Sequence, residues 1–206
     1  MPNPSSLSLR IGCVGLIALW ASLSACHSAE NSNATKAIQV HTISELHAGQ
    51  KLWQAQDQAR RETYFYQAMY IKSTGEYEVT GVQVVQNRIH SRMYKNFFRD
   101  PASDHVRFFR TWHEESVNTG RNQLGARPYK MEELYAECEH DIFGGKKAAD
   151  ELRISYRPDG SLIFCQRQAA ACRDDCSIGF YIDHIAYRRL DSKEQSRFLD
   201  EAFFKP

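Results

Sequence analysis

Residues 62–97 read ETYFYQAMYIKSTGEYEVTGVQVVQNRIHSRMYKNF, and the pattern of this stretch predicts the fold class. Aromatic and β-branched residues are dense in three segments, and such residues are enriched in strands. Turn-forming residues separate the segments, namely Ser73-Thr74-Gly75 and Gln86-Asn87. The pattern therefore predicts a three-stranded antiparallel meander, with strands at residues 62–72, 77–85 and 88–97.

Further strands are expected towards the C-terminus. Residues 106–113 form a candidate fourth strand, whereas residues 117–127 are polar, contain two glycines and predict a loop. Arg157-Pro158-Asp159-Gly160 has strong turn chemistry, since proline fixes φ and glycine accepts a positive φ. This turn predicts a hairpin of residues 152–157 and 161–166, followed by a last strand at residues 177–187.

Three helices are expected beside these strands. Residues 43–60 carry apolar residues at near-helical spacing, with Thr42 or Ser44 available to cap the start. A short C-terminal helix opens at residues 191–195, where Ser192 and Gln195 have capping-box spacing. A central helix from residue 130 ends at Gly144-Gly145, and one face of it carries Met131, Leu134, Tyr135, Cys138 and Ile142.

Strands with segregated helices predict an α+β fold. We expect an antiparallel sheet of about five to seven strands with a packed central helix plus N-terminal and C-terminal helices. The chain shows no repeat and no central linker, so residues 37–206 are expected to form a single globular domain.

The first 25 residues predict an export signal. Residues 1–10 hold one charge, Arg10, and the apolar run of residues 11–23 is too short for the roughly 20 residues that cross a bilayer. The run ends in Leu23-Ser24-Ala25-Cys26, which resembles the lipobox of bacterial lipoproteins. The alternative is an ordinary signal peptide, or a chance apolar stretch, with a chance cysteine.

The lipobox resemblance implies a membrane anchor. Cleavage would fall between Ala25 and Cys26, the Cys26 sulfur would take a diacylglycerol, and the new amino group would be acylated with a chain such as palmitate. Several chains hold a protein stably on a membrane. His27 stands where aspartate retains lipoproteins in the inner membrane, so the resemblance implies the outer membrane, facing the periplasm. Residues 26–36 are polar and predict a flexible tether.

Charge excludes one class of partner. Arg10 is the only charged residue among residues 1–25, so the mature chain has 25 basic and 25 acidic residues. A balanced chain has no electrostatic footprint for nucleic acid, and export argues in the same direction. Nucleic-acid partners are therefore not expected.

Four cysteines remain in the mature part, and an oxidising compartment favours disulfides between them. Four cysteines allow three connectivities. We favour Cys138 with Cys165 and Cys172 with Cys176. The alternatives are a metal site that adds His140, whose spacing does not fit zinc motifs, and a cysteine nucleophile beside His140 or His184.

Two polar clusters are candidate sites. Asp183-His184, with Arg173-Asp174-Asp175 before it, has the residue types for a general base or a cation site, but a solvated loop followed by a strand is favoured. His113-Glu114-Glu115 lacks the H-E-x-x-H spacing that places two histidines on one helical face, and a surface position is expected. No metal and no cofactor is expected.

A row of tyrosines is the candidate binding surface. Tyr64, Tyr66 and Tyr70 share one face of a predicted strand, and Tyr77 is expected near them on the next strand. If exposed, this row would form a flat aromatic surface, whereas under a helix it would belong to the core.

Residues 64–187 carry a second resemblance. Their order of a Tyr-rich strand, Val82-Gln83-Val84, the helix at Met131 and Ile154-Ser155-Tyr156 is similar to a family of small uncharacterised bacterial lipoprotein domains. The chain departs from that family in an insert at residues 98–128 and in having Pro158-Asp159-Gly160 in its late hairpin. The family has no established activity, so the resemblance carries over no catalytic residue.

These observations predict a membrane-anchored, non-enzymatic binding or scaffolding domain in the cell envelope. Its expected partners are the membrane, through the lipid, and an envelope protein. The alternatives are an inhibitor-like module that binds another envelope protein and a hydrolase that uses Asp183 and His184. If specificity resides in a loop, the insert at residues 98–128 is the expected place.

Overall fold

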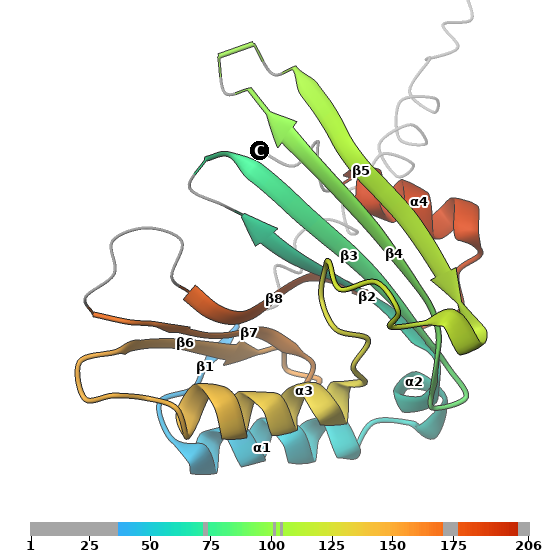
Figure 1. Ribbon diagram of the computed structural model, residues 1–206. Helices are drawn as coiled ribbons and strands as arrows, with labels where there is room; N and C mark the ends of the chain where they lie inside the picture. The colour runs from blue at the N-terminus through green and yellow to red at the C-terminus, as the bar shows by residue number, and fades with distance from the viewer. Residues whose placement is uncertain (1–36, 72–73, 101, 104, 171–176, 202–206) are drawn as a thin grey trace, which may run out of the picture. The chain divides into compact units, whose positions relative to one another are not determined.

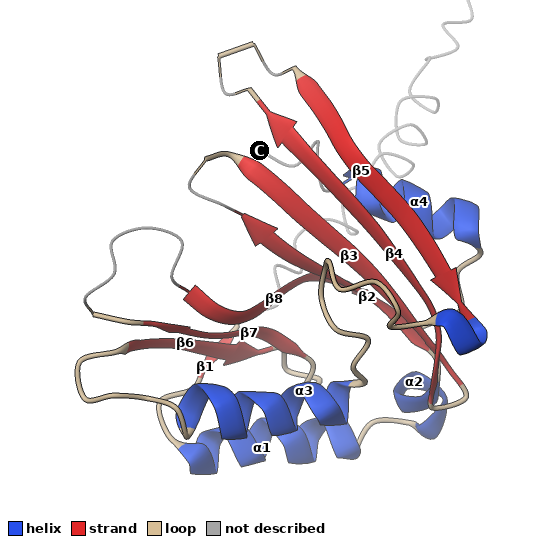
Figure 2. Cartoon of the chain, viewed as in Figure 1, coloured by secondary structure: helices blue, strands red, loops and turns tan. Residues whose placement is uncertain are grey.

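The computed structural model describes residues 37–71, 74–100, 102–103, 105–170 and 177–201. The predicted signal segment and tether lie outside the described residues, as do Cys26, Cys172 and Cys176. The described part has an α+β fold with an antiparallel sheet, as expected (Figures 1 and 2). No helix in this part is long and apolar enough to cross a membrane.

The sheet has eight strands within the described residues, one more than the upper expectation of seven. The strand that the sequence pattern missed is β1, which is only two residues long and pairs with β6 through Ile38 and Tyr156. Along the sheet the order is β1-β6-β7-β8-β2-β3-β4-β5, with every neighbouring pair antiparallel. The strands are β1 (Ile38–Gln39), β2 (Tyr64–Ile71), β3 (Glu76–Val85), β4 (Arg88–Arg99), β5 (Val106–Glu115), β6 (Glu151–Tyr156), β7 (Leu162–Gln168) and β8 (Ser177–Ala186).

The N-terminal helix region is divided in two. Helix α1 (Ile43–Gln54) begins at Thr42, whose side chain accepts a hydrogen bond from the Glu45 amide while the Glu45 carboxylate accepts one from the Thr42 amide. The expected continuation to residue 60 is wrong, because residues 54–58 carry no large apolar side chain that would hold a helix against the sheet. A separate short helix, α2 (Gln58–Glu62), follows.

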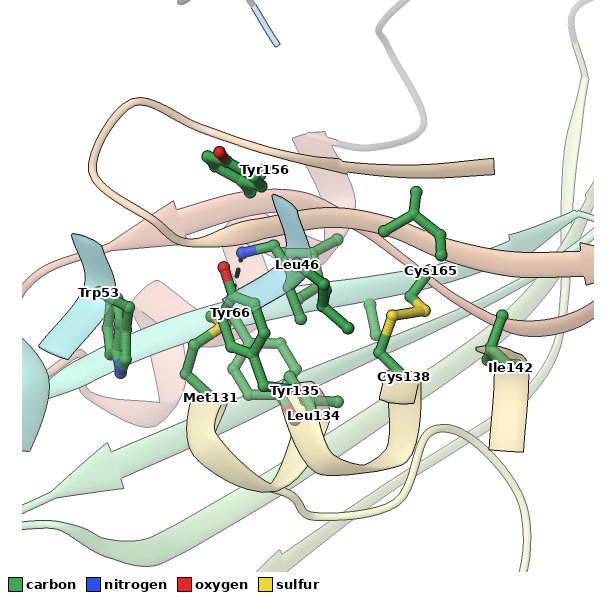
Figure 3. Close-up of a cluster of buried hydrophobic side chains, with 14 of the residues drawn as sticks. Leu46, Trp53, Tyr66, Met131, Leu134, Tyr135, Cys138, Ile142, Tyr156 and Cys165 are labelled. Carbon is green, nitrogen blue, oxygen red and sulfur yellow. Dashed lines mark hydrogen bonds between the residues drawn. A yellow bond between two sulfur atoms is a disulfide. The ribbon is translucent and has the colours of Figure 1, made fainter. Parts of the chain in front are cut away.

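Helices α1 and α3 (Met131–Glu137) lie side by side on one face of the sheet, which we call the first face (Figure 2). Helix α3 continues into the π turn η2 (Cys138–Phe143) and ends before Gly144-Gly145, as predicted. All five residues of the expected apolar face are buried. Cys138 is bonded to Cys165 of β7, which confirms that predicted pair and fastens this helix to the sheet (Figure 3).

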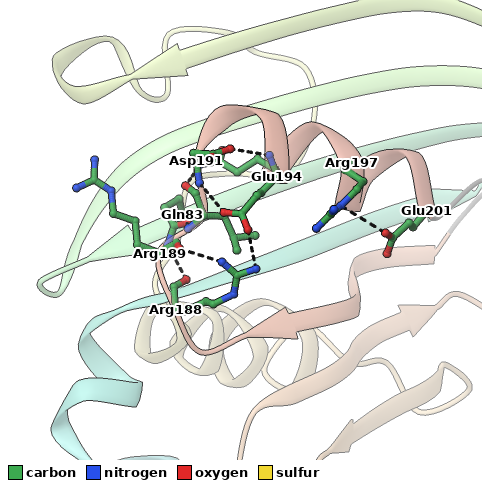
Figure 4. Close-up of polar contacts among 9 residues, drawn as sticks. Gln83, Arg188, Arg189, Asp191, Glu194, Arg197 and Glu201 are labelled. Carbon is green, nitrogen blue, oxygen red and sulfur yellow. Dashed lines mark hydrogen bonds and ion pairs between the residues drawn. The ribbon is translucent and has the colours of Figure 1, made fainter. Parts of the chain in front are cut away.

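The opposite face of the sheet, which we call the second face, is covered by α4 (Ser192–Glu201) over β3 and β4 (Figure 1). Leu199 packs there among Val79, Met93 and Phe97. The predicted capping box at Ser192 and Gln195 is wrong by one position. The Asp191 carboxylate accepts from the Glu194 amide, and the Glu194 carboxylate accepts from the Asp191 amide (Figure 4). Asp191 caps the helix because its side chain precedes the first turn.

Buried Gln83 of β3 fixes the start of this helix on the sheet. Its side-chain oxygen accepts a hydrogen bond from the Leu190 amide at 2.8 Å, and its side-chain nitrogen donates to the Tyr64 carbonyl at 2.8 Å. At the surface, Arg188 pairs with Glu194 at 2.8 Å. Buried polar contacts therefore hold the helix in addition to its apolar side.

Candidate functional site

A groove on the first face is the candidate site. Its floor comes from β2 and β8, with Ala68 and Phe180 at the centre. One side is the connecting loop, which we define as residues 119–130, and one end is α3. The groove consists of two adjoining hollows of about 250 and 200 Å³ that share four lining residues: Ala68, Ala126, Gly179 and Phe180.

A buried ion pair holds the connecting loop over the sheet. Arg92 of β4 and Glu114 of β5 face each other, with Nε to Oε2 at 3.0 Å. The Glu114 carboxylate accepts hydrogen bonds from the amides of Gly120 and Asn122 at 2.7 and 2.6 Å. The Arg92 guanidinium donates to the carbonyls of Asn122 and Ala126 at 2.7 and 2.9 Å. Two neighbouring strands therefore determine the path of the loop.

The expectation that Glu114 lies at the surface is wrong. Its neighbours His113 and Glu115 are exposed, but the strand alternation turns Glu114 under the connecting loop, where its side chain is 5% exposed. A carboxylate in this position is tolerated because Arg92 and three hydrogen bonds from residues 120 and 122 compensate it. The ring of Trp112 also stacks under the Arg92 guanidinium, 4.6 Å from ring centroid to Cζ.

Gly125 permits the closest approach of the loop to the sheet. Its φ is +79°, in the region that favours glycine. A Cβ at this position would lie 2.6 Å from Thr80 Oγ1 and 2.7 Å from Tyr94 Cδ2. The next amide, that of Ala126, donates to Thr80 Oγ1 at 2.9 Å. The groove wall thus depends on a residue without a side chain at position 125.

The predicted tyrosine row is divided between core and groove. The hydroxyl of Tyr66 donates to the Tyr129 carbonyl at 2.7 Å, and that of Tyr64 accepts from the Met131 amide at 2.8 Å. Both side chains are buried, and burial raises the pKa of each hydroxyl above its ordinary value. Tyr66 also lines the first hollow, and Tyr70 lines the second. The row is therefore no flat exposed surface.

Tyr77 does not join this row. It is paired with Ile71, so it points to the second face, where its ring stacks on that of Phe97 at 4.9 Å. Residues directly opposite each other in a sheet share a face, and Ile71 is one residue out of phase with Tyr70. The expectation that Tyr77 lies near the tyrosine row is wrong for this reason.

Two charged side chains stand at one side of the groove. Arg127 of the connecting loop donates to the Tyr129 hydroxyl at 3.0 Å, and this bond raises the pKa of its guanidinium. Glu137, at the end of α3, is half-buried. Burial raises the pKa of its carboxyl group, and the positive charge of Arg127 offsets part of that effect. The pair offers a cation and a hydrogen-bond acceptor beside an apolar floor.

The other predicted sites lie elsewhere. Asp183 sits at an irregularity of the β2–β8 pairing, where its carboxylate accepts a hydrogen bond from the Tyr181 hydroxyl at 2.9 Å. The ring of His184 packs against that of Phe198 at 4.6 Å. Neither residue lines the groove. Cys138 is in a disulfide, so it is not a free thiol, and no cluster of potential metal ligands occurs in the described ranges.

The insert at residues 98–128 has defined structure where it is described. It contains all of β5, the 3₁₀ turn η1 (Ser116–Asn118) and most of the connecting loop. Specificity was expected in this insert as a whole, and no sequence pattern predicts that the connecting loop lines a groove with β2 and β8. The chain matches no protein-family model, and no curated protein or solved structure is significantly similar to it.

Proposed function

We propose that this chain is a lipid-anchored, non-enzymatic binding domain of the bacterial cell envelope, and that the groove holds its ligand. The groove is the observation that carries the proposal. It combines an apolar floor, a wall with a fixed path and two charged groups at one side. Such a combination of apolar lining with a few placed polar groups is typical of small-molecule sites.

The shape of the groove indicates an amphipathic ligand. Ala68, Phe180 and Ile182 offer an apolar surface, against which a flat or aliphatic body packs. Arg127 suits an acidic group of the ligand, and Glu137 suits a hydrogen-bond donor. Each hollow, at about 250 or 200 Å³, is smaller than the usual range for ligand sites, roughly 300–1,000 Å³, so the proposed ligand is a small molecule rather than a folded partner.

The lipobox at Leu23-Ser24-Ala25-Cys26 supports the anchored location, and His27 supports the outer membrane. In this proposal the lipid on Cys26 occupies the membrane and residues 26–36 form the tether. The binding domain then faces the periplasm. The groove and the anchor are separate parts of the proposal and are tested separately.

A fluorescent probe tests the groove. The full chain, purified in detergent below the micelle-forming concentration, is titrated with 8-anilinonaphthalene-1-sulfonate, which joins an apolar ring system to an anion. We expect saturable binding that Ala126→Phe removes by filling the groove, and that Arg127→Gln weakens by roughly tenfold through loss of a charge-assisted contact. Ala126 lines both hollows.

The matched control is Ala136→Phe on α3, at an exposed position outside the groove lining. This variant should bind the probe as the unmodified chain does. Circular dichroism and the unfolding midpoint establish that each variant is folded. Equal probe binding by folded Ala126→Phe and by the unmodified chain would reject the groove as the binding site.

A further inference from the structure

Glu137 brings a carboxylate into the groove. It is the last residue of α3, is half-buried and lines the first hollow. Among the described residues no hydrogen bond or ion pair reaches this carboxylate, and the charges of Arg127 and Asp141 act on it only through space. Partly buried carboxylates are normally compensated by such contacts, because removing a charge from water is costly. The stability of the domain therefore does not explain this position.

Two neighbouring glutamates show the contrast. Glu133, one turn earlier on α3, accepts a hydrogen bond from the Lys130 amide at 2.6 Å. Glu139, on η2, pairs with His47 of α1 at 3.1 Å. Neither of them lines the groove, whereas Glu137 does. The carboxylate that faces the hollow is thus the one whose hydrogen-bonding capacity the fold leaves for a ligand.

The elements around Glu137 contribute groups of different kinds. The connecting loop contributes the positive charge of Arg127, and η2 contributes the negative charge of Asp141. Strand β2 contributes the Tyr66 hydroxyl, which already donates to the connecting loop, and β8 contributes apolar side chains. Burial and the charge of Asp141 raise the pKa of the Glu137 carboxyl group, and Arg127 offsets part of that effect. The charged form of Glu137 is therefore poorly compensated in the empty groove.

Arg127 and Glu137 together restrict the head group of the ligand. Arg127 alone would suit an anion, since a guanidinium has five N–H donors and one of them is used on the Tyr129 hydroxyl. Charged Glu137 can only accept, so a carboxylate head group would place a like charge beside it. An amide head group carries an acceptor for Arg127 and a donor for Glu137. The two residues are thus complementary to an amide at neutral pH.

We propose that Glu137 selects the head group of the ligand: an amide binds directly, whereas a carboxylate binds well only when Glu137 takes up a proton. The inference rests on the proposed function, because it concerns the ligand of the same groove. Proton uptake on binding links affinity to pH, so the affinity for a carboxylate rises as the pH falls towards the pKa of Glu137. The affinity for an amide does not rise over the same range.

Two probes of equal size test the selection. Octanamide and octanoate share an aliphatic chain and differ in the charge and the donor of the head group. Each is used to displace 8-anilinonaphthalene-1-sulfonate from the full chain in detergent, and the ratio of their displacement constants does not depend on that reporter. At about pH 8 we expect octanamide to bind roughly tenfold more tightly than octanoate. The ratio should shrink towards about pH 6, where octanoate itself is still charged.

Glu137→Gln keeps the size of the side chain and removes its charge. This variant should bind octanoate roughly tenfold more tightly at about pH 8 and should lose the pH dependence of the ratio. The matched control is Glu139→Gln, which removes the same charge two residues along the chain and outside the groove lining, and should keep both properties. Circular dichroism establishes that both variants are folded.

The outcomes separate this inference from the proposed function. Equal binding of octanamide and octanoate by the unmodified chain at about pH 8 would overturn the selection by Glu137 and leave the groove as a binding site. A folded Glu137→Gln variant that keeps the ratio and the pH dependence of the unmodified chain would do the same. Failure of the reporter to bind saturably would instead remove the proposed function, and this inference with it.

Discussion

The Arg92 guanidinium of β4 lies 3.0 Å from the Glu114 carboxylate of β5, and these side chains are only 2% and 5% exposed. The two groups do more than neutralise each other, because each also binds backbone groups of the connecting loop. The same ion pair therefore stabilises the sheet and holds the loop that lines the groove in position. Its removal should therefore affect both properties.

The variant Glu114→Gln measures how much this ion pair contributes to the free energy of unfolding. The amide keeps the size of the carboxylate but leaves the Arg92 charge buried without compensation, so the free energy of unfolding should fall by about 3 kcal/mol. Urea unfolding at pH 7 measures the loss. Glu151→Gln is the control, since it alters an Arg–Glu pair of 3.1 Å at the surface and should change stability by less than about 0.5 kcal/mol. Equal effects of the two variants would show that burial adds nothing.

The same carboxylate predicts a dependence on pH. Burial acts to raise the pKa of Glu114, but hydrogen bonds from Asn122 and Gly120 and the charge of Arg92 hold it below its usual 4.5. Because the pKa is lower in the folded state, this stabilisation is complete above pH 4.5 and is lost as the pH falls through the folded pKa. The difference in unfolding free energy between the unmodified chain and Glu114→Gln should shrink over that range. If the free energies of unfolding of the unmodified chain and of Glu114→Gln differ by the same amount down to acid pH, the lowered pKa of Glu114 is contradicted.

Gly125→Ala should disturb the connecting loop. The new Cβ would have to approach Thr80 Oγ1 to 2.6 Å at a φ of +79°. We expect a loss of about 2 kcal/mol in the free energy of unfolding, together with weaker probe binding in the groove. Gly120→Ala is the matched comparison. The φ of Gly120 is +92°, but the atom nearest to a Cβ added there, Pro128 Cγ, would be 3.3 Å away. A similar loss in both variants would assign the effect to φ alone.

Replacing the disulfide should destabilise the domain. Cys138 and Cys165 are 27 residues apart in the chain, so the bridge restricts the unfolded state by about 3.5 kcal/mol in the chain-entropy model. The double variant Cys138→Ala with Cys165→Ala should lose about that much, as measured by urea unfolding without reductant. Addition of reductant to the unmodified chain provides a second route to the same state. Unchanged unfolding midpoints in both experiments would contradict the expected role.

The lipid anchor has its own test. In a bacterial host that processes lipoproteins, the chain should be recovered with a mass that shows cleavage before Cys26 and addition of diacylglycerol. Cys26→Ser should remove the lipid and move the protein from the detergent phase to the aqueous phase. An unmodified Cys26 would reject the anchor but would leave the groove experiments unaffected.

Much of the fold follows from sequence periodicity. Alternation and aromatic density predict β2, β3 and β4, because these strands are long enough for a period of two to appear. The turn at Pro158-Asp159-Gly160 predicts the late hairpin, and the amide of Gly160 indeed donates to the Arg157 carbonyl at 2.8 Å. The predicted apolar face of the central helix is confirmed, because that segment is also long enough to show its periodicity. Local chemistry is sufficient at each of these positions.

The missed features depend on contacts between distant segments. Strand β1 is too short to have a period, and it exists because β6 offers an edge. Glu114 stands between exposed His113 and Glu115, so only its pairing with Arg92, 22 residues earlier, shows that it is buried. The groove requires the connecting loop, which is hydrogen-bonded to β3, β4 and β5, to lie beside β2 and β8. No local pattern encodes that arrangement.

The pairing of β2 with β8 places Ala68 opposite Ile182 and makes the groove floor from two strands that lie far apart in the chain. Between them in the chain come β3, β4, β5, β6, β7 and helix α3. A nascent or clipped chain that lacks β8 has half a floor and no site. Ligand binding would therefore report that the chain from β2 to β8 is present and that these two strands have paired.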